Sequence, residues 1–309
     1  MPRERPSYIR LYESGELSEK VVALRKILKR CTLCPRNCMI DRTRGVKGLC
    51  RVGASAMVSS FTPHFGEEPP LTGFAGSGTI FLSYCNLNCI FCQNFDISHL
   101  GQGAEVTTGE LAEMMISLQR KGCHNINFVT PTHQSAQIVA ALPQAAAQGL
   151  EIPLVYNSGG YDSPATIKLL EGVFDIYMPD IKYGDNDTAM LLSNSFDYVE
   201  LSRAALSEMH RQVGDLVINA DGIAERGVIV RHLVLPGGMA KTREVMKFVA
   251  EEISPDTYVN LMDQYRPCHN AVDNPAHPVL GRCVTPEEFA EAVQITKECG
   301  IKRIAEVTV

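Results

Sequence analysis

The sequence lacks several features that would indicate particular classes of protein. It contains no tryptophan, and no apolar run approaches the roughly 20 residues that a membrane-spanning helix needs. It has no dense block of lysine and arginine, and its formal net charge is -6, which argues against general binding to nucleic acid or to anionic membranes. The segment Met1–Lys20 is charged and has no apolar signal core. We therefore expect a cytoplasmic protein.

Common catalytic motifs are missing as well. There is no Walker loop, no G-x-S-x-G, no H-E-x-x-H, and no G-x-G-x-x-G after an expected strand. These absences argue against P-loop nucleotide hydrolysis, serine-hydrolase chemistry, zinc-protease chemistry and a dinucleotide-binding sheet.

Cysteine, by contrast, is abundant. The chain has 309 residues, 45% of them apolar, which is enough for one large α/β domain with a small extra lobe. It has 11 cysteines, and disulfides are rare in the cytosol, so clustered cysteines indicate metal or redox chemistry. Seven fall in two tight groups. The scattered ones are expected to be small buried apolar residues; they are Cys123, Cys268, Cys283 and Cys299.

Short apolar runs alternate with helical patterns from residue 79 onward. The expected strands are 79–84, 125–130, 153–157, 175–181, 228–235 and 258–262, with a hairpin partner at 216–219 and a last strand within 302–309. The expected helices are 107–122, 135–148, 164–170, 195–213, 242–253 and 286–300. Continuous apolar strands separated by helices favour a parallel sheet. About six such units predict an α/β fold with a partial (β/α)6 TIM-type barrel.

The chain is expected to divide into three parts. Residues 1–30 form a helical arm, residues 31–78 a Cys-rich metal-binding module with a connecting loop, and residues 79–309 the barrel core. The middle part has little apolar periodicity, so it would need a metal to hold it together.

The most specific signal is the C-x3-C-x2-C formed by Cys85, Cys89 and Cys92 at the end of the first apolar strand. Three thiolates can hold three corners of an iron–sulfur cube and leave one iron open to another ligand, which is typical of a catalytic site. The alternatives are a zinc site that lacks one ligand, or ordinary buried cysteines.

The string GSGTIFLSYCNLNCIFCQN resembles the cluster loop of radical S-adenosylmethionine (SAM) enzymes. It is most similar to the pyruvate formate-lyase-activating-enzyme-like branch. The stretches CTLCPRNC, GEEPPLTG, HNINFVTPTH, VYNSGGY, DIYMPDIKY, VRHLVLPG and LMDQYRP extend the resemblance over residues 31 to 267. It implies an oxidoreductase of anaerobic chemistry, in which SAM is cleaved reductively to a 5′-deoxyadenosyl radical that takes a hydrogen atom from the substrate.

The resemblance also implies site residues. Cys85, Cys89 and Cys92 would ligate a [4Fe-4S] cluster whose fourth iron binds SAM. The activating enzymes have a Gly-Gly-Glu stretch after the second strand, which Thr130, Thr132 and His133 replace here. The residues expected to contact SAM are Phe91, Thr130, Thr132, His133, Asn157, Ser158, Asp180 and Lys182. For each, a purely structural role is the alternative, such as a helix-start histidine, a loop turn or a strand-end ion pair.

Two further pairs lie in or directly after later strands. Arg231 and His232 are expected either to face the site or to pack inside the barrel, and Gln264 and Tyr265 could line a substrate pocket. A weaker constellation, made of Cys268, His269, His277 and Cys283, follows no metal-binding spacing that we recognise.

The second cysteine group has the pattern C-x2-C-x3-C-x11-C. Its members are Cys31, Cys34, Cys38 and Cys50. Four thiolates can close either an auxiliary [4Fe-4S] cluster or a zinc site, and the spacing of the first three favours the cluster. Free thiols are the third alternative.

The function expected from these observations is radical SAM chemistry. The hydrogen donor is either a glycine of a glycyl-radical partner protein, or a small molecule or another peptide. A remote alternative is a non-catalytic iron–sulfur or zinc protein. The resemblance implies a flavodoxin or ferredoxin as the electron donor, and we expect no nucleic-acid or membrane partner.

Overall fold

The computed structural model describes residues 5–305, and its core is one mainly parallel sheet. The parallel strands are β2 (Ser77–Leu82), β4 (Ile126–Val129), β5 (Leu154–Ser158), β6 (Ile176–Pro179), β8 (Ala224–Leu233), β9 (Tyr258–Met262) and β10 (Arg303–Ile304). The order across the sheet is β10-β9-β8-β6-β5-β4-β2-β1-β3. Over the described residues the sheet does not close, because β3 and β10 lie at its two ends.

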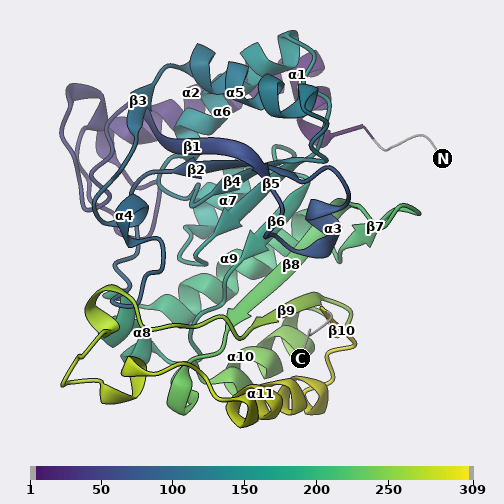
Figure 1. Ribbon diagram of the computed structural model, residues 1–309. Helices are drawn as coiled ribbons and strands as arrows, with labels where there is room; N and C mark the ends of the chain where they lie inside the picture. The colour runs from purple at the N-terminus through teal and green to yellow at the C-terminus, as the bar shows by residue number, and fades with distance from the viewer. Residues whose placement is uncertain (1–4, 306–309) are drawn as a thin grey trace.

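Helices connect successive strands and cover the sheet (Figure 1). They are α5 (Thr108–Arg120), α6 (Ser135–Ala147), α7 (Pro164–Leu169), α9 (Tyr198–Val213), α10 (Thr242–Phe248) and α11 (Pro286–Glu298). A five-residue π-helix, Val249–Ile253, continues α10. The short antiparallel strand β7 (Val217–Ile218) pairs with β8, as the hairpin prediction requires. The predicted α/β architecture, a partial barrel of parallel strands, is confirmed.

Local sequence signals account for where these helices begin. Helix α5 starts with a capping box, in which Thr107 accepts a bond from the Glu110 amide and Glu110 caps the Thr107 amide. Thr285 and Glu288 repeat this arrangement at α11. The apolar face of α5, which includes Leu111, is buried against the sheet and α6.

The expectation that residues 54–78 form a connecting loop is wrong over much of that segment. Strand β1 (Ala56–His64) pairs antiparallel with β2 and with β3 (Ala104–Val106), and α3 (Pro69–Thr72) follows it. The second half of β1 is partly exposed and includes Pro63, so it gives little apolar signal. Two further short helices were not predicted either, namely α4 (Phe95–Ser98) and α8 (Asn186–Ser193).

Two helices occupy the described part of the N-terminal arm. Helix α1 (Ser7–Ser14) and helix α2 (Glu16–Ile27) meet at Gly15, whose φ of 86° favours glycine. Tyr8, Leu17 and Leu24 are fully buried, and α2 packs on α6 and α7. The arm therefore shares the main hydrophobic core.

Residues 31–53 run without strands and contain one 3-10 turn, Arg42–Arg44. The segment folds back on itself, because the Cys31 amide donates to Ile40 O at 2.8 Å and the Met39 amide to Cys31 O at 3.0 Å. Figure 1 shows it near α4, on the side where the parallel strands end.

The division of the chain into arm, module and core stays a prediction. Within residues 5–305, no helix is both long and apolar enough to span a bilayer.

Candidate functional site

The loop Cys85–Cys92 begins directly after β2, at the carboxyl edge of the sheet. Tyr84 enters the loop with a φ of 66°, a strained backbone conformation of the kind that clusters at functional sites. Burial, followed by the neighbouring Cys89 thiol, raises the pKa of Cys85 to about 12. Burial also raises the pKa of Cys89, against the opposing charge of Lys182. The three thiols thus lie within electrostatic reach of one another, as ligands of one cluster must.

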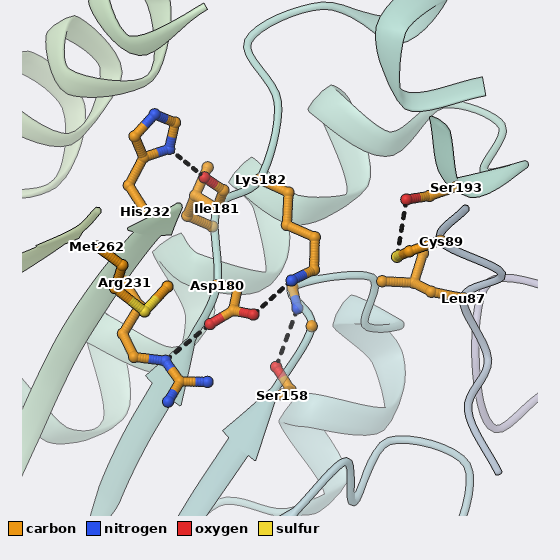
Figure 2. Close-up of polar contacts among 12 residues, drawn as sticks. Leu87, Cys89, Ser158, Asp180, Ile181, Lys182, Ser193, Arg231, His232 and Met262 are labelled. Atoms are coloured by element: carbon orange, nitrogen blue, oxygen red, sulfur yellow. Dashed lines mark hydrogen bonds and ion pairs between the residues drawn. The ribbon is translucent and has the colours of Figure 1, made fainter. Parts of the chain in front are cut away.

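Each sulfur of this loop lies at hydrogen-bond distance from a polar group. The Leu87 amide donates to Cys85 Sγ at 3.3 Å, Ser193 Oγ to Cys89 Sγ at 2.9 Å, and Ser98 Oγ lies 3.0 Å from Cys92 Sγ. Figure 2 shows the Ser193 bond. Such donors stabilise sulfur in its anionic form, which is the form that binds iron. The donor set therefore fits a three-cysteine iron–sulfur site.

A chain of charged side chains lies beside the loop, at the ends of β6 and within β8. Asp180 stands between Lys182 and Arg231, with Lys182 Nζ 2.5 Å from Oδ2 and Arg231 Nε 2.7 Å from Oδ1 (Figure 2). Burial alone would raise the pKa of Asp180, but the charges of Arg231 and Lys182 outweigh it and lower the pKa. The network is ionised, with Lys182 nearest the thiols.

Two carboxylates from the segment before α3 extend this network. Arg231 Nη1 lies 3.7 Å from Glu67 Oε2 and 3.9 Å from Glu68 Oε1, and Glu68 also accepts from Asn260 Nδ2 at 2.9 Å. Burial, partly opposed by Arg231, raises the pKa of Glu67 to about 7. Sequence reasoning missed both carboxylates as site residues, although the stretch GEEPPLTG was among those that carried the resemblance.

Asn157, Thr132 and Ser158 take part in the same polar region, through different partners. Asn157 Oδ1 accepts from Arg231 Nη2 at 2.7 Å. Thr132 Oγ1 and Ser158 Oγ both donate to Asp162, at 2.7 and 2.6 Å, and Tyr156 OH adds a third bond at 2.9 Å. Asp162 was not singled out from the sequence.

Backbone geometry shapes the ends of β4 and β5. Thr130, a β-branched residue, has a φ of 63°, a second strained position at a strand end. Gly160 has a φ of 77°, and a Cβ there would collide with the carbonyl of Asp180. Glycine is thus required where the β5 loop crosses the charged network.

The remaining predicted residues have mainly apolar or structural surroundings. Phe91 is buried edge-to-face against Tyr265, with ring centroids 5.8 Å apart. Gln264 contributes its carbonyl, which accepts from Gln93 at 2.8 Å. His232 is held between Ile181 O and Thr242 Oγ1, and burial lowers its pKa to about 4, so it is neutral. His232 therefore has the packing role that was one of its two predicted alternatives.

The N-terminal cysteines line a single cavity. Cys31, Cys34, Cys38 and Cys50 share it, and a Cβ on Gly48 would lie 2.9 Å from Cys38 Sγ. Glycine at position 48 is thus needed for the chain to pass so close to a thiol. Four thiols in one cavity fit a metal group.

Arg42 and His133 complete the wall of this cavity. Arg42 is almost fully buried, and its Nη1 reaches His133 O at 2.8 Å and Cys31 Sγ at 3.8 Å. Its charge opposes the effect of burial on the pKa of Cys50. The expectation that His133 contacts SAM stays a prediction, and the contact shown on the side of the N-terminal cavity is the bond from Arg42 to its backbone carbonyl.

Arg36 joins the two cysteine groups. It lies between Cys34 and Cys38 in the chain, yet its guanidinium donates to three carbonyls outside the segment. Nε reaches Asn86 O at 2.7 Å, Nη2 reaches Ser193 O at 3.4 Å, and Nη1 contacts Asn194 O. The first carbonyl adjoins Cys85, and Ser193 is the donor to Cys89.

No three His, Cys, Asp or Glu side chains in the described part of the chain are grouped so that they could hold a single metal ion. A single ion needs its donors around one point, whereas each ligand of a four-iron cluster binds a different iron. Among the loosely spaced residues Cys268, His269, His277 and Cys283, His269 stacks on the ring of Phe95, with ring centroids 4.3 Å apart.

Comparison with known proteins identifies the class to which this site belongs. The model of the radical SAM superfamily matches residues 79–249, more than half of the chain. The chain therefore belongs to the radical SAM superfamily, and membership implies a [4Fe-4S] cluster and SAM. The match is to the superfamily, so the activating-enzyme branch stays a prediction.

Two individual proteins are similar to this chain, one in sequence and one in fold. The chain is 30% identical over 298 residues to the uncharacterized protein MJ0674 of Methanocaldococcus jannaschii, a match that covers 93% of this chain and 80% of that protein. It is similar in fold to HydG, a maturase of the [FeFe]-hydrogenase, with a TM-score of 0.50 and 14% identity. That similarity covers 73% of this chain and only half of the HydG chain.

Proposed function

We propose that this chain binds SAM at a [4Fe-4S] cluster on Cys85, Cys89 and Cys92 and directs hydrogen-atom abstraction from a substrate held beside the Asp180 network. The observation that carries the proposal is the buried three-thiol loop, with a hydrogen-bond partner near each sulfur, directly beside Lys182. When bound, the cluster and SAM supply reductive cleavage to methionine and a 5′-deoxyadenosyl radical.

The chain's own residues would place SAM and exclude water. Lys182 suits the carboxylate of the methionine part and Asp180 its amino group, since both are buried and ionised. Phe91, packed on Tyr265, offers an apolar surface for the adenine. Thr130 and Asn157 stand at neighbouring strand ends and would complete the contacts. Thr132 and Ser158 would act through Asp162, to which their hydroxyls already donate.

The N-terminal cysteines are proposed to hold a second metal group. We favour an auxiliary [4Fe-4S] cluster over zinc, because Cys31, Cys34 and Cys38 have the spacing of a cluster loop. A cytoplasmic flavodoxin or ferredoxin is proposed as the reductant, in keeping with the family resemblance.

The substrate has two candidates. A glycine of a glycyl-radical partner protein is supported by the sequence resemblance to activating enzymes. A polar small molecule or polar peptide is supported by the structure, because Glu67, Glu68 and Arg231 form a charged group that the backbone of a glycine would not use.

The first experiment is SAM cleavage under anaerobic conditions. Reconstituted protein with dithionite and SAM should form 5′-deoxyadenosine, measured by chromatography. If fully loaded protein forms none, the proposed function is wrong.

A second measurement separates the substrates. A glycyl-radical doublet in the EPR spectrum of a candidate partner protein would establish the first. Vigorous 5′-deoxyadenosine formation without that doublet, and with deuterium transfer from a polar small molecule, would establish the second.

A further inference from the structure

We infer that His133 is a metal ligand of the N-terminal site, binding through Nδ1 alongside cysteines that lie about 100 residues earlier in the chain. The inference rests on the proposal that the N-terminal cysteines hold a metal group. The inference adds a ligand from the barrel core to the N-terminal metal group. The spacing of the cysteines could not indicate this ligand.

The first observation is an orphaned nitrogen. His133 is fully buried, and its Nδ1 has no hydrogen-bond partner among the described residues. A buried polar atom without a partner is rare, because leaving it unpaired costs roughly 1–3 kcal/mol. His133 is also one of the residues that line the cavity shared by the four N-terminal thiols. A metal group in that cavity would satisfy the orphaned atom.

The second observation concerns the tautomer. His133 Nε2 lies 3.1 Å from Ser83 O and 3.3 Å from Gln134 Nε2, which itself donates to Ser83 O at 2.9 Å. We place the ring proton on Nε2, where it can be donated to the Ser83 carbonyl. Nδ1 then bears a lone pair. A second proton on the ring would place an unpaired cation beside the buried Arg42, which contacts the His133 carbonyl. Metal-binding histidines characteristically give their other N–H to a carbonyl or carboxylate, as here.

The third observation concerns the surroundings. Arg42 Nη1 contacts both Cys31 Sγ and the backbone of His133, so the ligand from the barrel and the first cysteine share one neighbour. Gln134, next in the chain, ties this corner to β1 by accepting from the Met57 amide at 2.7 Å. The histidine therefore stands on a rigid part of the fold, which suits a ligand.

The test uses full-length holoprotein without added SAM, labelled with 15N-histidine. The reduced native protein should show a strong hyperfine coupling to a directly bound nitrogen, measured by pulsed EPR. His133→Gln should abolish the coupling. It should also speed metal loss to EDTA by about 10- to 100-fold, the usual effect of weakening a ligand set. Glutamine at this position can still donate to Ser83 O, so the structural bond is kept while Nδ1 is removed.

The variant His64→Gln is the matched control. His64 is a partly exposed histidine of β1 that lies 4.0 Å from Glu67 and is not among the residues that line the N-terminal cavity, so its replacement should change neither the coupling nor the metal retention. His133→Asn, which keeps a polar atom near the Nδ1 position but cannot reach Ser83, covers the case in which the glutamine variant does not fold.

Two results would overturn the inference. One is the absence of any nitrogen coupling in iron-loaded native protein. The other is metal retention in His133→Gln equal to that of the native protein, with iron or with zinc. Neither result touches SAM cleavage, so failure here is distinguishable from failure of the proposed function.

Discussion

The two cysteine groups use the same side chain in different surroundings. The thiols of Cys85, Cys89 and Cys92 have an amide and two serine hydroxyls near them, and they adjoin the charged network through Lys182. The N-terminal thiols line a cavity to which the buried residues Arg42 and His133 also contribute. The thiols of Cys85, Cys89 and Cys92 lie beside charged side chains that could hold a substrate. The N-terminal thiols are enclosed mainly by residues of their own segment.

Under the proposed function, this difference separates a reaction site from a supporting one. A site that must accept SAM needs an open ligand position and polar groups beyond it. A metal site that only stabilises a segment without regular structure needs no open ligand position, and its metal can be fully surrounded by protein ligands. Arg36 connects the two, so the sites should differ in chemistry and yet depend on each other. Four changes would break or sharpen this comparison.

The largest effect is expected from Cys89→Ala. Loss of one of three ligands should abolish 5′-deoxyadenosine formation and lower the iron content by about four atoms per chain, the content of one cube. The iron of the N-terminal site should remain. Cys299→Ala, at a partly exposed cysteine after α11, is the control and should behave like the native protein. Retained cleavage in Cys89→Ala would contradict the assignment of the reaction site.

The next largest effect is expected from Cys34→Ala. Cys34 is buried in the N-terminal cavity, so its loss should release the metal and lower the free energy of unfolding by more than about 3 kcal/mol. Anaerobic chemical denaturation measures this. The iron on the Cys85 loop should still load at low temperature. Native stability with a full complement of N-terminal metal would show that Cys34 is not a ligand.

Arg36→Ala should weaken the reaction site from a distance. It removes the bonds to the carbonyls of Asn86, Ser193 and Asn194, at about 1.5–3 kcal/mol for a charged donor. We expect SAM cleavage to fall about tenfold, because small displacements of reacting groups are costly. The control is Arg44→Ala, in the same segment but exposed and paired only with Asp41 among the described residues. Equal rates in the two variants would refute the connection.

The smallest effect concerns Glu67 and pH. The folded-state pKa of Glu67 is raised to about 7 from 4.5, so its contribution to stability is full below pH 4.5 and is lost as pH rises through 7. In Glu67→Gln this loss should disappear. Over that pH range, the free energy of unfolding of the native protein should fall by about 2 kcal/mol more than that of the variant. Parallel pH profiles would show that Glu67 has an ordinary pKa.

Sequence predicted the parts of the molecule that depend on local signals. The strands from residue 79, the helix starts at Thr107 and Thr285, and the spacing of Cys85, Cys89 and Cys92 are all readable from neighbours in the chain. Strand β1 was missed because it lies beside an edge of the sheet and is polar along its exposed half. Local pattern cannot show which strand such a segment joins.

The missed site residues are those brought together by topology. Glu67 and Glu68 approach Arg231 although more than 160 positions separate them in the chain, and His133 meets Cys31 across about 100. No periodicity or spacing encodes such proximity. His133 was singled out from the sequence as a possible SAM contact, but its place beside the cavity of Cys31 was not foreseen. The orphaned Nδ1 and the raised pKa of Glu67 are visible only once the fold is known.

The bonds of Arg36 also bear on how the protein must be handled in air. If the N-terminal cysteines hold a metal group as proposed, loss of that group to oxidation would loosen the segment that carries Arg36. Arg36 would then leave the carbonyls of Asn86 and Ser193. Refilling the Cys85 loop alone would in that case not restore turnover.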